Sequence, residues 1–201
     1  LENIYIQILI FSTLMLGTIG FIDDYIKVFK KDKKGLKGKF KIAGQSLLGI
    51  FVALILLSNN DITIVEFDKN LNDDKIEFSE VEEIKSFKTT VPFFKDNELD
   101  YSEISNSIFK HGDKLLWLIL IPVVIFIISA VSNSNNLTDG LDGLSAGLSA
   151  IIVFTLGVFA WTSGNIIFSE YLNIMYIPRV GEITIFIAAL LGSLVGFLWY
   201  N

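Results

Sequence analysis

The sequence contains no cysteine and only one histidine. Without cysteine the chain forms neither a disulfide scaffold nor a thiolate zinc site, and a single histidine is weak evidence for any metal site. Charged residues are also scarce, at 19% against 52% hydrophobic residues, and the mean hydropathy is +0.57. This composition excludes an ordinary soluble enzyme and a disordered tail, and it favours an integral membrane protein.

Five apolar stretches are long enough to cross about 30 Å of hydrocarbon. They cover residues 4–22, 42–57, 115–131, 144–162 and 183–200. The predicted fold class is therefore an all-α membrane protein, a polytopic bundle with about five transmembrane helices. Because the sequence starts at a leucine and stops at the end of an apolar stretch, we expect a fragment that lacks both ends of a longer protein.

Charge is segregated along the chain. Eight of the sixteen basic residues fall between positions 27 and 41, and fourteen of the twenty-two acidic residues fall between positions 61 and 113. The positive-inside rule places the short lysine-rich loop in the cytoplasm, and parity then places residues 58–114 outside and residues 132–143 inside. We predict three segments: residues 1–57 with two transmembrane helices and the basic cytoplasmic loop, residues 58–114 as an extracytoplasmic polar insert, and residues 115–201 with three further helices and an aspartate-rich cytoplasmic loop.

The polar insert shows the alternation of apolar and polar residues that is typical of strands. The pattern covers residues 62–67 and 75–78. It predicts a small strand-containing extracytoplasmic cap, and we expect no chemistry there.

Two adjacent carboxylates, Asp23 and Asp24, close the first apolar stretch. At the C-terminal end of a helix each acid costs up to about 1 kcal/mol, because the helix dipole is negative there. Neutralisation by the neighbouring lysines is one interpretation of the pair. The other is functional, since paired acids at a membrane interface can bind Mg²⁺ or act as a base on a phosphate.

A second group of acids lies in residues 136–144. Asn136 or Thr138 is a suitable N-cap for the fourth helix, and the spacing of Asp139 and Asp142 places both on one side of its first turn. The structural interpretation is a helix start with favourable acids, worth about 1 kcal/mol. Together, four carboxylates on one face beside a basic loop predict Mg²⁺-assisted handling of a diphosphate whose acceptor is a lipid.

Three motifs carry a resemblance to a known family: Gly-Phe-Ile-Asp-Asp-Tyr at 20–25, Lys-Asp-Lys-Lys-Gly-Leu at 31–36, and Asn-Leu-Thr-Asp-Gly-Leu-Asp-Gly-Leu at 136–144. They resemble the phospho-N-acetylmuramoyl-pentapeptide transferases, a bacterial family of the polyprenyl-phosphate N-acetylhexosamine-1-phosphate transferase superfamily. The resemblance covers all five spans. It implies transfer of phospho-MurNAc-pentapeptide from UDP-MurNAc-pentapeptide to undecaprenyl phosphate, which gives lipid I and UMP with Mg²⁺ as cofactor. It further implies a multi-pass protein of the bacterial inner membrane that acts in peptidoglycan biosynthesis on the cytoplasmic face.

The resemblance also implies roles for individual residues. Asp23 matches the candidate base toward the lipid phosphate, Asp24 its neighbour at the metal and phosphates, and both are candidate Mg²⁺ ligands. Lys34 and Lys41 match two phosphate-binding lysines. Asn136 and Asp139 match two residues that contact the uridine part of the donor, and Asp142 matches a third essential acid. The family's later Met-Gly-Asp and histidine-rich motifs are absent from residues 1–201, so we expect the fragment alone to lack a complete metal site and to be inactive.

Other functions stay open at this point. A related enzyme that transfers GlcNAc-1-phosphate to a polyprenyl phosphate is the nearest alternative. An ion-coupled transporter would place its acids in mid-membrane, whereas these four acids lie at span ends, and a structural scaffold would need no acid pairs. Besides the two substrates, the expected partners are the lipid bilayer and a second copy in a homodimer, with no nucleic acid.

Overall fold

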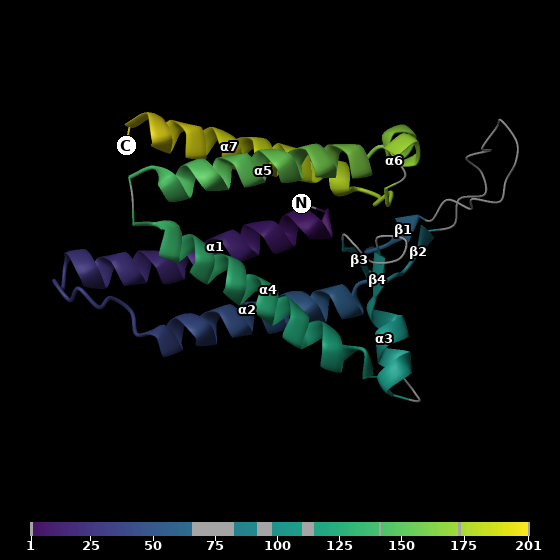
Figure 1. The fold of residues 1–201 in the computed structure, drawn as a ribbon, viewed down its shortest axis with the longest axis horizontal. Helices are drawn as coiled ribbons and strands as arrows, with labels where there is room; N and C mark the ends of the chain where they lie inside the picture. Colours follow the sequence, from purple (N-terminus) through teal and green to yellow (C-terminus); the bar gives the residue numbers. More distant parts are fainter. Residues whose placement is uncertain are drawn as a thin grey trace, which may run out of the picture. The chain divides into compact units, whose positions relative to one another are not determined.

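The computed structural model describes residues 2–65, 83–91, 98–109, 115–140, 142–172 and 174–200 (Figure 1). This part of the chain contains five helices that are long and apolar enough to cross a membrane: α1 (Ile4–Val28), α2 (Gly38–Ser58), α4 (Trp117–Thr138), α5 (Leu144–Ser163) and α7 (Ile183–Tyr200). The predicted all-α, multi-pass membrane architecture is thereby confirmed. The shorter elements are α3 (Tyr101–Ile108), α6 (Ile166–Leu172), the 3₁₀ turn η4 (Val180–Glu182) and four short strands, β1 (Ile64–Val65), β2 (Glu83–Ile84), β3 (Lys88–Thr90) and β4 (Glu98–Asp100).

Two of the long helices continue beyond their predicted ends. The first was expected to stop at residue 22 and the third at residue 131, but α1 reaches Val28 and α4 reaches Thr138. Hydropathy falls at these points, yet the polar side chains find partners: Asp23 pairs with Lys27 one turn later, and Asn133 donates to the Ser129 carbonyl at 2.8 Å. Polar side chains that find partners in this way are compatible with a helix that continues beyond its apolar stretch.

The chain divides into two compact units, each described here by itself. The first comprises Leu1–Gln7, Asn60–Ser86 and Asn135–Asn201, and the second comprises Ile8–Asn59 and Phe87–Ser134. The three predicted segments follow membrane topology rather than contacts, so that division stays a prediction.

In the second unit, α2 packs closely on both α1 and α4. The rings of Phe11 and Phe51 join α1 to α2 with centroids 4.4 Å apart. On the other side, a Cβ at Gly49 would lie 2.8 Å from the Cα of Ile125, which is closer than van der Waals contact allows. Such backbone approach through a glycine is typical of helices packed within a membrane, where interfaces are built from small residues and interhelical hydrogen bonds.

The remaining surface of the long helices is apolar and outward-facing. In the most hydrophobic window of α1 and of α7 no residue is buried. A soluble protein would not expose such surfaces, whereas a membrane helix leaves them in contact with hydrocarbon.

The described part of the polar insert contains four short strands. β1 pairs antiparallel with β2 in the first unit, and β3 pairs antiparallel with β4 in the second. β1 lies within the predicted alternating stretch 62–67, whereas residues 75–78 lie outside the described residues. The sequence analysis missed α3, although Asp100 caps this helix by accepting hydrogen bonds from the backbone N–H groups of Ser102 and Glu103.

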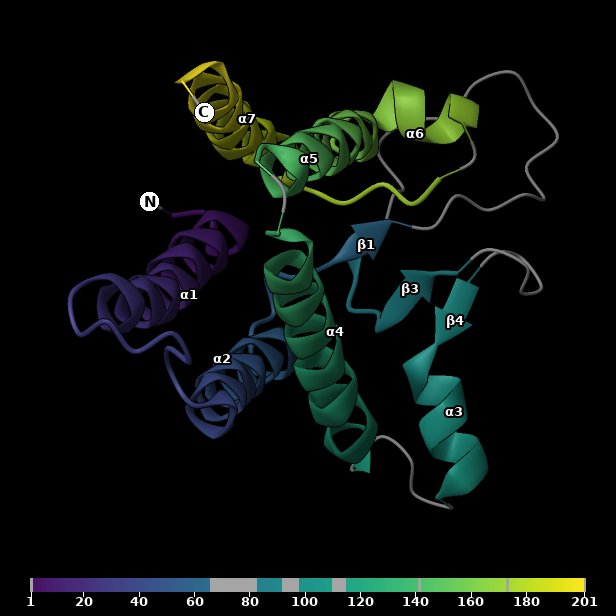
Figure 2. The same ribbon diagram turned by 60° about the vertical axis from the view of Figure 1, so that its left-hand side comes forward.

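In the first unit, α5 and α7 run side by side, as both ribbon views show (Figures 1 and 2). α6 follows α5, and the segment after it returns to β1, where the Val65 N–H donates to the Tyr176 carbonyl at 3.0 Å. The short strands of this unit are thereby tied to the connection that leads into α7.

Candidate functional site

Asp23 is the best-connected charged residue among the described residues. Its Oδ2 atom lies 2.6 Å from Lys27 Nζ and 2.9 Å from Lys41 Nζ. Its Oδ1 atom accepts a hydrogen bond of 2.7 Å from the backbone N–H of Leu36. The side chain is only 5% exposed. One carboxylate thus joins the last turns of α1, the connection to α2 and the first turn of α2.

The connection between α1 and α2, residues 29–37, is called the basic loop below. Asp32 organises it: its Oδ1 accepts from Lys34 N–H at 3.0 Å and its carbonyl oxygen from Gly35 N–H at 3.0 Å. Gly35 has a φ of +62°, a conformation that side chains with a Cβ rarely adopt. A methyl group there would also collide with Asp23 Oδ1. The glycine therefore allows the loop backbone to rest directly on the buried carboxylate.

Six lysines of this region remain available to a ligand. They are all exposed, and within the described ranges none of them forms an ion pair: Lys30, Lys31, Lys33, Lys34, Lys37 and Lys39. Lys34 uses its backbone in the loop and leaves its ammonium group free. Lys41, in contrast, is largely buried and paired with Asp23. Of the two predicted phosphate-binding lysines, Lys34 is therefore the one with an accessible charge.

The two candidate metal ligands differ sharply. Both oxygens of Asp23 already accept from ammonium or amide donors and its side chain is only 5% exposed, so this carboxylate does not fit Mg²⁺, which needs oxygen atoms that it can reach. Asp24 is 75% exposed, with one longer contact of 3.6 Å to Lys27, and it does fit. In the part of the chain that the structure describes, no three acidic or histidine side chains gather into a set that could hold a metal.

The second predicted group of residues lies where α4 turns into α5, and its local structure differs from the prediction. Asn136 and Thr138 belong to the last turn of α4 and do not cap the next helix. α5 begins at Leu144 after Gly143, which has a φ of +75°. Asp139 and Asp142 therefore lie in the turn between the two helices, not in the first turn of α5, and both are exposed. The prediction was wrong because it ended α4 too early.

Asn135 holds this turn in place. Its Oδ1 atom accepts from Ser145 Oγ at 2.8 Å and from Ser149 Oγ at 3.2 Å, so the end of α4 is tied to the first two turns of α5. The sequence did not point to Asn135, although it lies next to the motif at 136–144. The spacing of Ser145 and Ser149 by four residues does not indicate which side chain accepts their hydrogen bonds.

The structure thus brings the predicted residues together in two groups. Asp23 and Lys41 are in direct contact with Asp24 adjacent, and in the other unit Asn136 ends α4 just before the turn that contains Asp139 and Asp142. The predicted convergence of the two groups stays a prediction. Lys27 was missed as a member of the first group, and its spacing of four residues from Asp23 was the signal.

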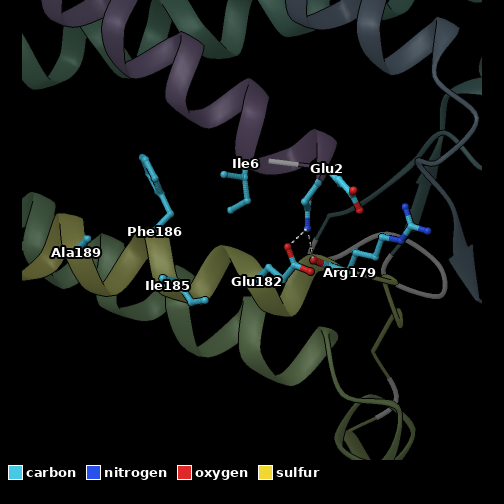
Figure 3. A pocket seen from close by; sticks show the side chains of 8 residues that line it. Glu2, Ile6, Arg179, Glu182, Ile185, Phe186 and Ala189 are labelled. Atoms are coloured by element: carbon cyan, nitrogen blue, oxygen red, sulfur yellow. Dashed lines mark hydrogen bonds between the residues drawn. The ribbon is translucent and has the colours of Figure 1, made fainter.

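A cavity of about 840 Å³ lies elsewhere in the first unit (Figure 3). It is lined by Ile6, Phe186 and neighbouring residues of α1 and α7, and at its edge Asn3 donates to the Arg179 carbonyl at 2.9 Å and to Glu182 at 3.0 Å. None of the predicted site residues lines it. The candidate site is therefore the basic loop with its acids.

Comparison with known proteins identifies the family. The profile of glycosyl transferase family 4 matches residues 6–201. The chain belongs to glycosyl transferase family 4. Both acid groups and the basic loop lie within the part of the chain that this family covers.

Curated relatives from several bacteria are identical to the chain at about half of the aligned residues. Each is named phospho-N-acetylmuramoyl-pentapeptide-transferase: the protein of Flavobacterium johnsoniae is 56% identical over 208 residues, that of Amoebophilus asiaticus 52% over 204, and that of Bacteroides fragilis 48% over 204. All three alignments cover 100% of this chain and 48–50% of the relative. The chain therefore spans about half the length of the curated relatives it matches.

Proposed function

We propose that this chain forms the basic-loop half of a phospho-N-acetylmuramoyl-pentapeptide transferase. In this reaction an oxygen of undecaprenyl phosphate attacks the sugar-linked phosphorus of UDP-MurNAc-pentapeptide. A P–O bond forms to the lipid phosphate, the P–O bond of the diphosphate breaks, and UMP leaves with the bonding electrons. The products are lipid I and UMP, which places the reaction in peptidoglycan biosynthesis.

The observation that carries the proposal is the group of six exposed lysines at the end of an apolar helix. A diphosphate donor and a phosphate acceptor bring several negative charges to one place, and exposed ammonium groups that form no ion pair among the described residues can neutralise them. The lysines follow directly on α1, so the same site can meet a donor from water and an acceptor held in the bilayer. Relatives that carry the name of this transferase, and that are identical to the chain at about half of the aligned residues, support the same function.

Further parts of the proposal follow from the same resemblance. The protein acts at the cytoplasmic face of the bacterial inner membrane, as the lysine-rich loop predicts. It requires Mg²⁺, which neutralises phosphate charge, and Asp24 is the residue of this cluster that would hold it. A homodimer is the assembly expected for the whole protein. An ion-coupled transporter and a structural scaffold fit poorly with membership of a glycosyl transferase family.

The test uses the purified full-length protein with UDP-MurNAc-pentapeptide and undecaprenyl phosphate. We expect equal amounts of UMP and of the lipid-linked product, and loss of both when EDTA removes Mg²⁺. UDP-GlcNAc serves as the competing donor, because it tests the related GlcNAc-1-phosphate transferases. A faster reaction with UDP-GlcNAc would identify UDP-GlcNAc as the donor in place of UDP-MurNAc-pentapeptide. If neither donor yields UMP, the transferase function is refuted.

A further inference from the structure

Asp23 has a role that its sequence position does not suggest. The resemblance assigns it to proton abstraction from the lipid phosphate, and a base needs a lone pair that faces the substrate. In the structure Oδ2 lies between two ammonium groups, Oδ1 accepts from Leu36 N–H, and the side chain is almost fully buried. This geometry leaves little of the carboxylate for a substrate.

We propose that Asp23 is a positioning residue that clamps the basic loop against the start of α2 and so presents the exposed lysines to the diphosphate of the donor. The inference rests on the proposed function for the identity of the donor. The clamp itself rests only on contacts within the second unit, in which Asp23, Lys27, Leu36 and Lys41 all lie.

Three contacts explain how one side chain controls the loop. Leu36 N–H donates to Asp23 directly, so the loop backbone is held at its C-terminal end. Lys41 fixes the same carboxylate to α2, and Lys27 fixes it to α1. Both ammonium nitrogens lie within 3 Å of one oxygen, so loss of the negative charge would leave two like charges facing each other.

Gly35 provides a second way to break the clamp without removing any charge. Its backbone rests on Asp23 Oδ1 in a positive-φ conformation, and the added methyl group of Gly35→Ala meets that oxygen. Gly38→Ala is the matched control, because Gly38 begins α2 only three residues later and an added methyl group meets nothing within 4 Å. A clamp predicts the same defect for Asp23→Asn and Gly35→Ala, whereas a base predicts a defect for Asp23→Asn alone.

The first experiment measures the loop itself in the full-length protein in detergent. Trypsin cleaves after lysine, so the initial cleavage rate at residues 30–37, mapped by mass spectrometry, follows the population of the open loop. We expect Asp23→Asn and Gly35→Ala to raise this rate roughly 10- to 100-fold, which corresponds to the loss of a charge-assisted hydrogen bond. Gly38→Ala should match the wild type, and cleavage at Lys85 and Lys88 should stay unchanged in every variant that is folded.

The second experiment uses UDP as the diphosphate probe and needs no turnover. UDP should protect the loop of the wild type from trypsin, and half-protection of Asp23→Asn and of Gly35→Ala should need roughly 10- to 100-fold more UDP. In turnover assays the same two variants should raise the KM for the donor more than they lower kcat, and the double variant should lose no more than the worse single variant.

Three results would overturn the proposal. The first is cleavage of the loop in Gly35→Ala at the wild-type rate. The second is protection of Asp23→Asn and Gly35→Ala by the same UDP concentration that protects the wild type. The third is a double variant whose loss of activity equals the product of the two single losses. A wild-type protein that fails to transfer phospho-MurNAc-pentapeptide would refute the proposed function, while the cleavage and UDP results would still decide whether the clamp exists.

Discussion

A buried amide pair between α2 and α4 offers a quantitative test of how the second unit is held together. Gln45 is almost fully buried. Its Nε2 donates to Ser132 Oγ at 3.0 Å and to Asn133 Oδ1 at 3.4 Å, and its Oε1 accepts from Asn133 Nδ2 at 3.1 Å. Replacement of Gln45 by leucine keeps a side chain of similar size but removes all three bonds. Asn133 would keep only its bond to the Ser129 carbonyl.

The expected magnitude follows from these hydrogen bonds. Interhelical hydrogen bonds within membranes contribute about 0.6 kcal/mol on average and at most about 1.7 kcal/mol. Gln45→Leu should therefore lower the free energy of unfolding by about 1–2 kcal/mol, and Asn133→Leu by a similar amount. Because both variants remove the same contact, the double variant should cost about 1 kcal/mol less than the two single effects added together.

The assay is reversible unfolding of the full-length protein in mixed micelles, with helicity followed as the denaturing detergent increases. Asn136→Leu is the matched control, since this amide lies on α4 only three residues beyond Asn133 but is exposed, and we expect a change below about 0.5 kcal/mol. Strict additivity of Gln45→Leu and Asn133→Leu would refute the reasoning, because the contact between them would then contribute nothing.

Three further predictions concern the basic loop and the two acids that precede it. A cysteine at Lys33 should react with an impermeant thiol reagent only after the cell is opened, and one at Asp61 should react from outside; labelling from the same side would contradict the five-span parity. Lys34→Ala should raise the KM for the donor more than it lowers kcat, because a phosphate contact acts largely in substrate binding, and a pure loss of kcat would assign Lys34 to the transition state instead. Asp24→Asn should raise the Mg²⁺ concentration for half-maximal activity, whereas Asp23→Asn should not; equal shifts would make both acids metal ligands.

The sequence predicted the membrane architecture well because hydropathy reports directly on it. All five spans lie where long apolar runs occur, since hydrocarbon requires continuous apolar helix whatever the tertiary contacts are. The helix ends were less predictable. α1 and α4 continue through Asp23 and Asn133, whose partners Lys41 and Gln45 lie on another helix, and hydropathy along the chain contains no information about such partners.

The site was predicted as a set of residue types rather than as a geometry. The motifs indicated Asp23, Asp24 and Lys34 as members of one site, which stays a prediction. They did not show which charges are already neutralised inside the protein, because that depends on the fold of the basic loop over α1. Gly35 was part of a quoted motif, but its role as the point where the loop touches Asp23 follows only from its positive φ.

The contrast between Asp23 and Asp24 shows why two adjacent acids need not share a role. Successive residues of an α-helix point about 100° apart, so two neighbouring acids lie in different surroundings even where both reach one lysine, as Asp23 and Asp24 reach Lys27. In α1 this rotation turns Asp23 onto the loop and α2, where it is 5% exposed, and leaves Asp24 75% exposed. Asp23 is held by two lysines and a backbone N–H group, whereas Asp24 can exchange its distant lysine contact for a cation from solution at little cost. The buried Asp23 is therefore suited to binding the lysines of the protein itself, and the exposed Asp24 to binding a cation that accompanies a phosphate substrate.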